Sequence, residues 1–263
     1  MAEELFDRNR RRLARDRAAA LGPELFLLDR AFDDCLARIE AIRRPFSRAL
    51  LIGAASPDWK IRLSDLVGSV DIVEPGQRFA AASDGGQADE DRHDFGSDLY
   101  DLVLAVGTLD TVNDLPVALQ RIRRAMTADA CLIGAIAGGN TLPTLRHAML
   151  QADRQNGYVA ARAHPRIDGP TLAGLLGAAG FVAPVVDIDR VTIRYATLQK
   201  LVADLRAMGA TNQLRRQSPP LRKSGYTAAI AAFSALGDGQ KTPEIVEILH
   251  FLGWTSAARQ SPN

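Results

Sequence analysis

The chain contains little cysteine and little lysine. Its 263 residues include only two cysteines, Cys35 and Cys131, which are far apart and lie in apolar or helical stretches of sequence. So few cysteines argue against a disulfide framework and fit a reducing compartment. Only four of the 32 basic residues are lysine, a bias that we attribute to genome composition.

Long apolar runs and a strong net charge are also absent. No segment approaches the roughly 18 to 20 consecutive apolar residues that span a bilayer. Acidic residues occupy the start of the chain, where signal and transit peptides avoid them. The net charge is only +1, which argues against a surface built mainly for nucleic acid or anionic membrane. We therefore expect a bacterial cytoplasmic protein with no transmembrane segment and no nucleic-acid partner.

What remains is the composition of an ordinary globular protein, with 47% hydrophobic and 24% charged residues. This balance excludes the disordered and fibrous classes. The length suits one α/β domain of roughly five to seven strands, or two small domains. The four histidines are scattered without the spacing of a metal site, so no bound metal is expected.

From residue 48 onward, short apolar runs alternate with segments of helical periodicity. Strands without polar alternation, separated by helices, predict a parallel sheet that is covered on both faces. The sequence therefore predicts a doubly wound α/β core. The expected strands are residues 49–53, 70–74, 99–107, 130–136, 181–191 and 245–252. The expected helices after residue 48 are 57–67, 115–126, 142–156, 168–180, 198–208 and 228–236, with a mobile loop at 213–225.

The first part of the chain is helical by pattern, over residues 5–44, with a new helix beginning near Pro23. Six arginines lie between Arg8 and Arg17. Such a row indicates either a solvated helix face or a helix that docks on a partner. An acidic stretch at residues 84–101 offsets these arginines in the net charge.

Candidate ligand-binding residues follow the first three strands, because ligands of doubly wound sheets bind beyond the carboxyl ends of the strands. Gly53 permits a tight turn, and the amides after it can face an anion. Glu74 ends the second strand, where an acid can accept both hydroxyls of a ribose or can simply be solvated. Residues 89–91, Asp-Glu-Asp, precede the third strand; a carboxylate there can accept an adenine amino hydrogen, or the loop can hold no ligand.

A second group of candidates lies after residue 140. His164 stands beside Arg162 and Arg166, a combination suited to an acidic substrate or a protein partner, although a solvated loop is the alternative. Arg146 lies one helical turn after Leu142 and can overlook the pocket or form a surface salt bridge.

The order of strand, glycine turn, acid-ended strand and Asp loop resembles the class I S-adenosylmethionine-dependent methyltransferases. Later segments are similar to one branch, which contains a mitochondrial complex I assembly factor with arginine hydroxylase activity and is close to the malonyl-carrier-protein methyltransferase of biotin synthesis. The resemblance runs from about residue 6 to residue 254. The segments that carry it are FDR at 6–8, VNDLP at 112–116, IGA at 133–135, GGNTL at 138–142, LR at 145–146, DLRAMG at 204–209, Asn212 and GW at 253–254.

The resemblance implies a Rossmann-like fold with a mostly parallel seven-stranded sheet and helices on both faces. It implies an N-terminal helical extension over residues 1–45 and a methyltransferase-like domain over 46–263, with inserted helices at about 140–180 and 197–240. It also implies S-adenosylmethionine as cofactor, with Arg146, Arg162 and His164 facing substrate or partner. The implied cofactor contacts are Gly53, Ala54, Ala55, Glu74, Pro75, Asp89, Glu90, Val106 and Gly107.

Several positions depart from the family pattern of an acid followed by Gly-x-Gly-x-Gly. Those positions are Leu51, Gly53, Ala55 and Pro57. A methyl at Ala55 would crowd the carboxypropyl group of the cofactor, and Pro57 removes an amide donor. Residues 75–88 are short for a full helix plus strand, and Asp110 and Thr111 replace a His-Trp type pair.

Two functions follow from the resemblance and its departures. The first is an S-adenosylmethionine-dependent modification of a protein side chain, with a respiratory complex I subunit as the expected protein substrate and methylation or arginine hydroxylation as the reaction. The second is a non-catalytic assembly factor that has lost cofactor binding. The residues name no catalytic group, and either function fits a monomer or a small homo-oligomer.

Overall fold

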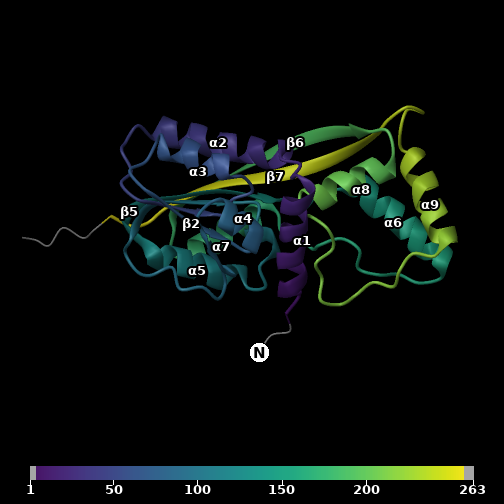
Figure 1. Ribbon diagram of the computed structural model, residues 1–263, viewed down its shortest axis with the longest axis horizontal. Coiled ribbons are helices and arrows are strands. Elements are labelled where there is room, and N and C mark those ends of the chain that lie inside the picture. The colour runs from purple at the N-terminus through teal and green to yellow at the C-terminus, as the bar shows by residue number, and fades with distance from the viewer. Residues whose placement is uncertain (1–3, 258–263) are drawn as a thin grey trace, which may run out of the picture.

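The computed structural model describes residues 4–257 and places them around one seven-stranded sheet (Figure 1). The sheet order is β3-β2-β1-β4-β5-β7-β6, and β7 runs antiparallel to both of its neighbours. The predicted fold class, a mostly parallel Rossmann-like sheet with helices on both faces, is confirmed. The strands are β1 (Ala49–Ile52), β2 (Val70–Glu74), β3 (Gly86–Gln87), β4 (Tyr100–Val106), β5 (Met126–Ala137), β6 (Val182–Tyr195) and β7 (Thr242–Trp254).

Helices cover both faces of the sheet because its central strands are apolar on both sides. Helices α2 and α3 pack on one face, where Phe32 stacks on Trp59, and helices α5 and α7 pack on the other. The helices are α1 (Arg8–Leu21), α2 (Phe26–Ile42), α3 (Pro57–Ser64), α4 (Gln77–Ala82), α5 (Leu115–Ala125), α6 (Pro143–Asn156), α7 (Gly169–Ala178), α8 (Leu198–Ala207) and α9 (Lys223–Ser234). Within the described part of the chain, no helix is both long enough and apolar enough to cross a membrane.

The segment between β2 and β4 is too short for a full helix plus strand, as the sequence indicates. Residues 75–88 do accommodate a helix and a strand, because both are very short: α4 has six residues and β3 has two. β3 pairs with β2 only at Val73 and Glu74. The short connection keeps the acidic loop that follows it close to the end of β2.

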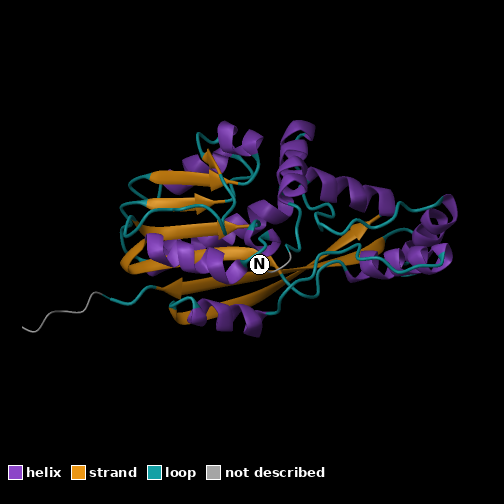
Figure 2. Ribbon diagram, turned by 90° about the horizontal axis from the view of Figure 1, so that it is seen from below, coloured by secondary structure: helices purple, strands orange, loops and turns teal. Residues whose placement is uncertain are grey.

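The two longest paired strands, β6 and β7, extend beyond the rest of the sheet. Figure 2 shows this ribbon running from the parallel strands to a group of helices at the far end. Those helices are α6, α8 and α9. Buried Leu198 of α8 and Phe233 of α9 belong to the same apolar core as Leu51 and Leu104 of the sheet. The far end is therefore continuous with the sheet in its packing.

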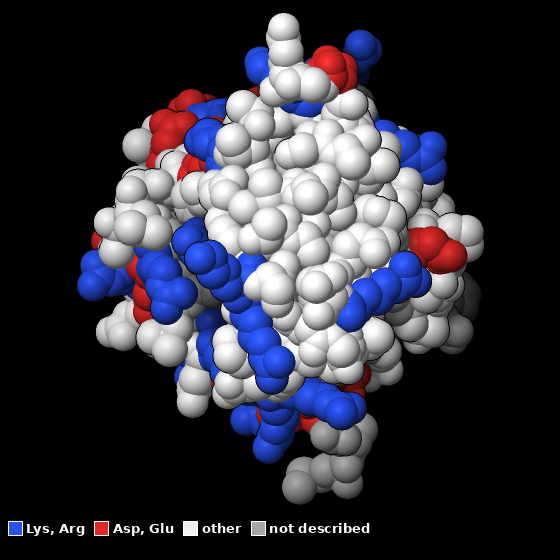
Figure 3. Space-filling model, turned by 90° about the vertical axis from the view of Figure 1, so that its right-hand side faces the viewer, with Lys and Arg blue, Asp and Glu red and all other residues white. Residues whose placement is uncertain are grey.

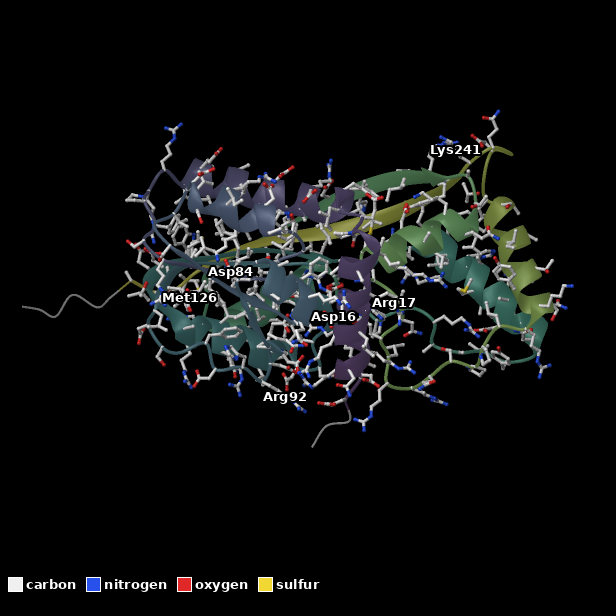
Figure 4. The ribbon with its side chains drawn as sticks, in the orientation of Figure 1. Asp16, Arg17, Asp84, Arg92, Met126 and Lys241 are labelled. Atoms are coloured by element: carbon white, nitrogen blue, oxygen red, sulfur yellow. The ribbon has the colours of Figure 1, made fainter. Side chains whose placement is uncertain are left out.

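Helix α1 stands across the carboxyl ends of the central strands, between the sheet and α8 (Figure 1). Asp7 caps its start by accepting a hydrogen bond from the Arg10 amide, at 3.1 Å. Asp16, labelled in Figure 4, accepts a hydrogen bond from the Arg78 amide of α4 at 2.8 Å. These contacts place α1 over the edge of the sheet where the sequence predicts a cofactor.

Candidate functional site

The turn after β1 is built around Gly53. Its amide donates to the Val73 carbonyl at 2.9 Å, and its φ of +84° lies in the region that favours glycine. A Cβ at this position would lie 2.4 Å from the Val106 carbonyl oxygen, so only glycine fits between β1 and β4. Thr108 packs over the same spot, with its Cγ2 2.7 Å from that Cβ position.

The amides that follow Gly53 are largely used inside the protein. The Ala54 amide donates to Glu74 Oε2 at 3.0 Å, and the Asp58 amide donates to Ser56 Oγ at 3.2 Å. Pro57 begins α3 and has no amide hydrogen. The Ala55 methyl is buried in the core, 1% exposed. This turn therefore offers few donors to an anionic group.

Glu74 is fully buried, so the alternative of a solvated carboxylate is wrong. Its Oε1 accepts from Arg15 Nε at 2.8 Å and from the Gly76 amide at 2.9 Å. Its Oε2 accepts from Arg15 Nη2 at 2.7 Å and from the Ala54 amide at 3.0 Å. A carboxylate has about four acceptor positions, and four donors fill them here. Glu74 has no free acceptor for a ribose hydroxyl in this arrangement.

The acidic loop before β4 is paired with α1 in the same way. Arg11 donates to both oxygens of Glu90, at 2.6 and 2.8 Å, and Arg8 donates to both oxygens of Asp91, also at 2.6 and 2.8 Å. Arg12 Nη2 lies 2.6 Å from Asp89 Oδ2. The four arginines of α1 that make these pairs are Arg8, Arg11, Arg12 and Arg15.

The side chains of these arginines therefore correct the prediction of a solvated or partner-docking face. Residues 8, 11, 12 and 15 are spaced by three and four, which places them on one side of a helix. That side faces the protein: Arg11 is 2% exposed and Arg15 is 5% exposed. The sequence contains both the four arginines at helical spacing and the four acids. No local pattern shows that the arginines contact the acids.

The electrostatics of two of the pairs, Arg11 with Glu90 and Arg8 with Asp91, favour the charged carboxylates. Burial opposes ionisation of Glu90, but the adjacent Arg11 guanidinium outweighs it and holds the pKa of Glu90 below its usual value. Burial likewise opposes ionisation of Asp91, and the hydrogen bonds from Arg8 bring its pKa below the usual value. Bidentate guanidinium pairs of this kind supply both charge and hydrogen bonds to buried carboxylates.

These contacts do not fit S-adenosylmethionine. The cofactor would need Glu74 for its ribose, and Arg15 occupies both oxygens of that side chain. Arg15 also fills the space next to the turn after β2, since its Cβ lies 2.6 Å from the position of a Cβ on Gly76. One oxygen, Asp89 Oδ1, is buried without a hydrogen-bond partner within the described residues. A single remaining acceptor beneath α1 does not make a nucleoside site.

A cavity of about 120 Å³ lies next to the filled cleft. Of the predicted cofactor contacts, only Pro75 and Gly107 line it; Gly53, Ala54, Ala55, Glu74, Asp89, Glu90 and Val106 do not. Its walls are mainly apolar and come from α2, β5, α8 and β7. The apolar side chains in the lining are Leu27, Leu28, Ala31, Ala135, Ile136, Ala137, Leu142, Leu205, Met208, Ala210, Val246 and Ile248.

His164 lines this cavity and is buried, so the alternative of a solvated loop is wrong for it. Its Nε2 accepts a hydrogen bond from the Gln213 amide at 2.9 Å, which assigns the ring proton to Nδ1. Burial, assisted by the nearby positive charge of Arg166, lowers the pKa of His164 to about 4. Arg166 is itself paired with Asp110 at 2.6 Å. The ring is therefore neutral at pH 7.

Two buried polar atoms in the cavity lining have no hydrogen-bond partner within the described residues. They are Thr108 Oγ1 and Gln213 Oε1. The hydroxyl can donate or accept, and the amide oxygen can accept. Neither residue was singled out from the sequence, because neither belongs to a recognisable motif.

The other predicted partner residues, Arg146 and Arg162, do not line the cavity. Arg162 Nε is paired with buried Asp153 at 2.7 Å, and Arg146 Nη2 donates to the Gly139 carbonyl at 3.1 Å. Both instead line a neighbouring hollow along α6, and Arg162 also lines the hollow between that one and the cavity. The structure thus divides the predicted site residues between the filled cleft, the cavity and the surface of α6.

Metal and thiol chemistry have no obvious place in the described residues. No group of three or more His, Cys, Asp or Glu side chains is arranged there to hold a metal ion. Cys35 and Cys131 are both buried, and burial raises the pKa of each thiol to about 12. Neither cysteine is therefore poised as a nucleophile.

Comparisons with curated proteins give relatives along most of the chain, although no family model matches it. The chain is 30% identical over 265 residues to the mitochondrial arginine-hydroxylase NDUFAF5 of Danio rerio, covering 95% of this chain and 82% of that protein. It is 28% identical over 275 residues to the malonyl-[acyl-carrier protein] O-methyltransferase of Laribacter hongkongensis, covering 96% and 91%.

Solved structures share the fold at low sequence identity. The YcgJ protein of Bacillus subtilis aligns with a TM-score of 0.60 at 12% identity, over 86% of this chain and 99% of that one. The N-methyltransferase NodS of Bradyrhizobium japonicum, solved with S-adenosyl-L-homocysteine, aligns with a TM-score of 0.51 at 13% identity, over 94% and 98%. Together with the fold, the sequence relatives show that the chain belongs to the NDUFAF5 branch of the class I S-adenosylmethionine-dependent methyltransferase superfamily.

Proposed function

We propose that this chain is an assembly factor that binds a protein partner without using S-adenosylmethionine. The observation that carries the proposal is the pairing of Arg15 with Glu74, which places a guanidinium where the ribose of the cofactor would lie. Removing that guanidinium would leave a buried carboxylate unpaired, which costs several kcal/mol. A cofactor would have to displace α1 and meet this cost.

The partner that we propose is a subunit of respiratory complex I. This choice rests on the NDUFAF5 relatives and on the resemblance to complex I assembly factors along the chain. The fold and its apolar cavity are present although α1 fills the cleft. This combination favours the binding of a partner over the catalysis of a reaction. We also propose a bacterial cytoplasmic location, as expected from the sequence.

Calorimetric titration with S-adenosylmethionine and S-adenosylhomocysteine tests the loss of cofactor binding. We expect neither heat of binding nor a thermal shift at millimolar ligand. A ligand present at a hundred times its Kd would add about 2.7 kcal/mol to the free energy of unfolding, so binding of that strength would be detected. NodS, which was solved with S-adenosyl-L-homocysteine, is a suitable control under the same conditions. Saturable binding that a Glu74→Ala substitution abolishes would overturn the proposal.

Copurification from a bacterium with a respiratory complex I tests the partner. The tagged chain should recover complex I subunits before the complex is complete. Mass spectrometry of those subunits then tests the enzymatic alternative. An added methylene or oxygen on a side chain, lost when the gene is deleted and restored by the purified chain, would establish an enzyme and contradict the proposal.

A further inference from the structure

Three neighbouring hollows on the structure share lining residues. The cavity beside α1 shares Thr141, Leu142, His164, Arg166, Leu205 and Ala210 with a second hollow of about 220 Å³. The second hollow shares Leu145, Met149, Arg162 and Ala163 with a third, of about 270 Å³, along α6. We call these three adjoining hollows, which extend from the cavity beside α1 to Leu150 of α6, the α6 groove.

The outer wall of the α6 groove is held firmly in place. This wall is the segment 160–164, and three donors fix it to the loop that follows α8. Asn212 Nδ2 and Ser218 Oγ both donate to the Ala161 carbonyl, at 3.1 and 2.7 Å. Arg162 Nη2 donates to the Pro219 carbonyl at 2.9 Å. The groove is therefore preformed, which reduces the entropic cost of binding.

The groove combines an apolar floor with an excess of positive charge. Leu145, Met149 and Leu150 of α6 line its outer half. Its acids, Asp110 and Asp153, are each paired with a groove arginine, at 2.6 and 2.7 Å. Arg146 and Arg206 have no ion pair within the described residues and remain to attract an anionic occupant.

The surroundings of the groove have the same character. Residues 196–241 contain seven basic and two acidic side chains. Figure 3 shows this end of the molecule, where Lys and Arg side chains border a broad uncharged area. Residues 224–237, which include most of α9, carry no charged side chain at all. An acidic partner with apolar side chains complements such a surface.

A polypeptide can offer both complementary features along one extended path, because it can carry apolar side chains at some positions and carboxylates at others. A fatty acyl chain has a single anionic end and would match only the apolar floor.

We propose that the α6 groove binds an extended segment of the partner protein in which apolar and acidic residues alternate. The apolar side chains contact the α6 floor, and the carboxylates face Arg146 and Arg206. This inference rests on the proposed partner-binding function and identifies the surface that performs it. It does not depend on whether the cleft under α1 admits a cofactor.

Fluorescence anisotropy with labelled synthetic peptides tests the groove. A short peptide alternating Glu and Leu should bind saturably, and its affinity should fall as salt screens the charges. Peptides alternating Lys and Leu, or Glu and Ser, should bind at least about tenfold more weakly, because each lacks one of the two complementary features. Equal binding of all three peptides would overturn the inference, as would binding of phosphatidylserine vesicles without any binding of the Glu/Leu peptide.

Matched variants locate the binding site. Arg146→Glu and Arg206→Glu should each weaken the Glu/Leu peptide about tenfold, whereas Arg43→Glu, an identical charge change at a residue that lines none of the three hollows, should not. Ala163→Trp fills the junction of the outer two hollows and should abolish binding while the thermal unfolding midpoint stays near that of the parent. Unchanged affinity in Ala163→Trp, or an equal loss in Arg43→Glu, would contradict the inference. Titration of the same variants with S-adenosylmethionine separately reports on the proposed function.

Discussion

His164 shows how burial at one residue fixes its chemistry. The ring lies between an edge contact with Phe6, at a centroid distance of 5.2 Å, and a hydrogen bond from the Gln213 amide. Burial is the main reason that its pKa falls from the usual 6.5 to about 4. The folded protein therefore holds His164 neutral over a range of pH in which the unfolded chain would protonate it.

This difference predicts a pH dependence of stability. The folded pKa is lowered, so the unfolded chain binds the proton first, and stability is complete above about pH 6.5 and is lost as the pH falls towards 4. The loss from this residue is about 3 kcal/mol across that window. Urea unfolding of the parent and of His164→Gln over the same pH range measures it, and the parent should show the steeper decline. Parallel pH profiles for the two proteins would contradict the assignment.

At the scale of the secondary-structure element, α1 is the part whose position most affects the site. Of its four inward arginines, Arg15 contacts Glu74 at the end of β2, and the other three contact the consecutive acids of residues 89–91. Arg11 also donates to the Thr108 carbonyl at 2.8 Å. Helix α1 thus joins the end of β2, the loop before β4 and the loop after β4. Its own apolar contacts are few, since among its buried side chains only Ala14 and Ala18 are apolar.

Docking of α1 should therefore depend on its ion pairs. Arg15→Ala leaves Glu74 buried beside two amides but without a guanidinium, and we expect it to lower the free energy of unfolding by about 3–5 kcal/mol. Arg15→Lys retains the charge but loses the bidentate contact with Glu74, so it should lower the free energy of unfolding by less than Arg15→Ala does. Arg17→Ala, at the exposed position labelled in Figure 4, is the control and should change stability by less than about 0.5 kcal/mol. Urea denaturation compares the three; similar values for the two alanine variants would show that the pairs do not hold the helix.

The sequence predicts the elements that depend on local pattern, but it does not predict the long-range contacts of α1. The strand expected at residues 70–74 matches β2, and the helix expected at 168–180 matches α7, where Asp168 caps the start by accepting a hydrogen bond from the Thr171 amide at 2.9 Å. Both depend on local pattern, which a single sequence displays. The burial of Arg11 depends on Glu90, 79 residues away, and no local pattern contains that contact.

The candidate site follows the same division. Gly53 and Glu74 were placed correctly at the carboxyl edge of the sheet, because strand order and chain direction determine which residues lie there. The contact between Glu74 and Arg15 could not be predicted from the sequence, because Arg15 belongs to a different element, α1. The hollows along α6 could not be predicted from the sequence either, because they form where α6, α8 and two loops meet.

At the scale of the whole molecule, one apolar core joins the sheet to the helices at its far end. Phe233 of α9 is fully buried and belongs to the same cluster as Leu51 of β1 and Phe32 of α2. Long strands β6 and β7 run the length of this core and connect its two ends (Figure 2). The continuity implies that the end bearing the α6 groove does not unfold separately from the sheet.

Phe233→Ala tests this continuity. Removing a buried phenylalanine side chain costs about 3–5 kcal/mol through lost burial and the cavity that remains. If the molecule is one cooperative unit, far-UV circular dichroism and tryptophan fluorescence should show the same lowered urea midpoint. The fluorescence reports from Trp59 and Trp254, which both lie in the sheet half. Phe26→Ala, at a side chain that is 40% exposed, is the control and should leave the midpoint nearly unchanged. An early circular dichroism transition with an unshifted fluorescence transition would mean that the helical end unfolds by itself, and the α6 groove would then lose the rigid floor on which peptide binding depends.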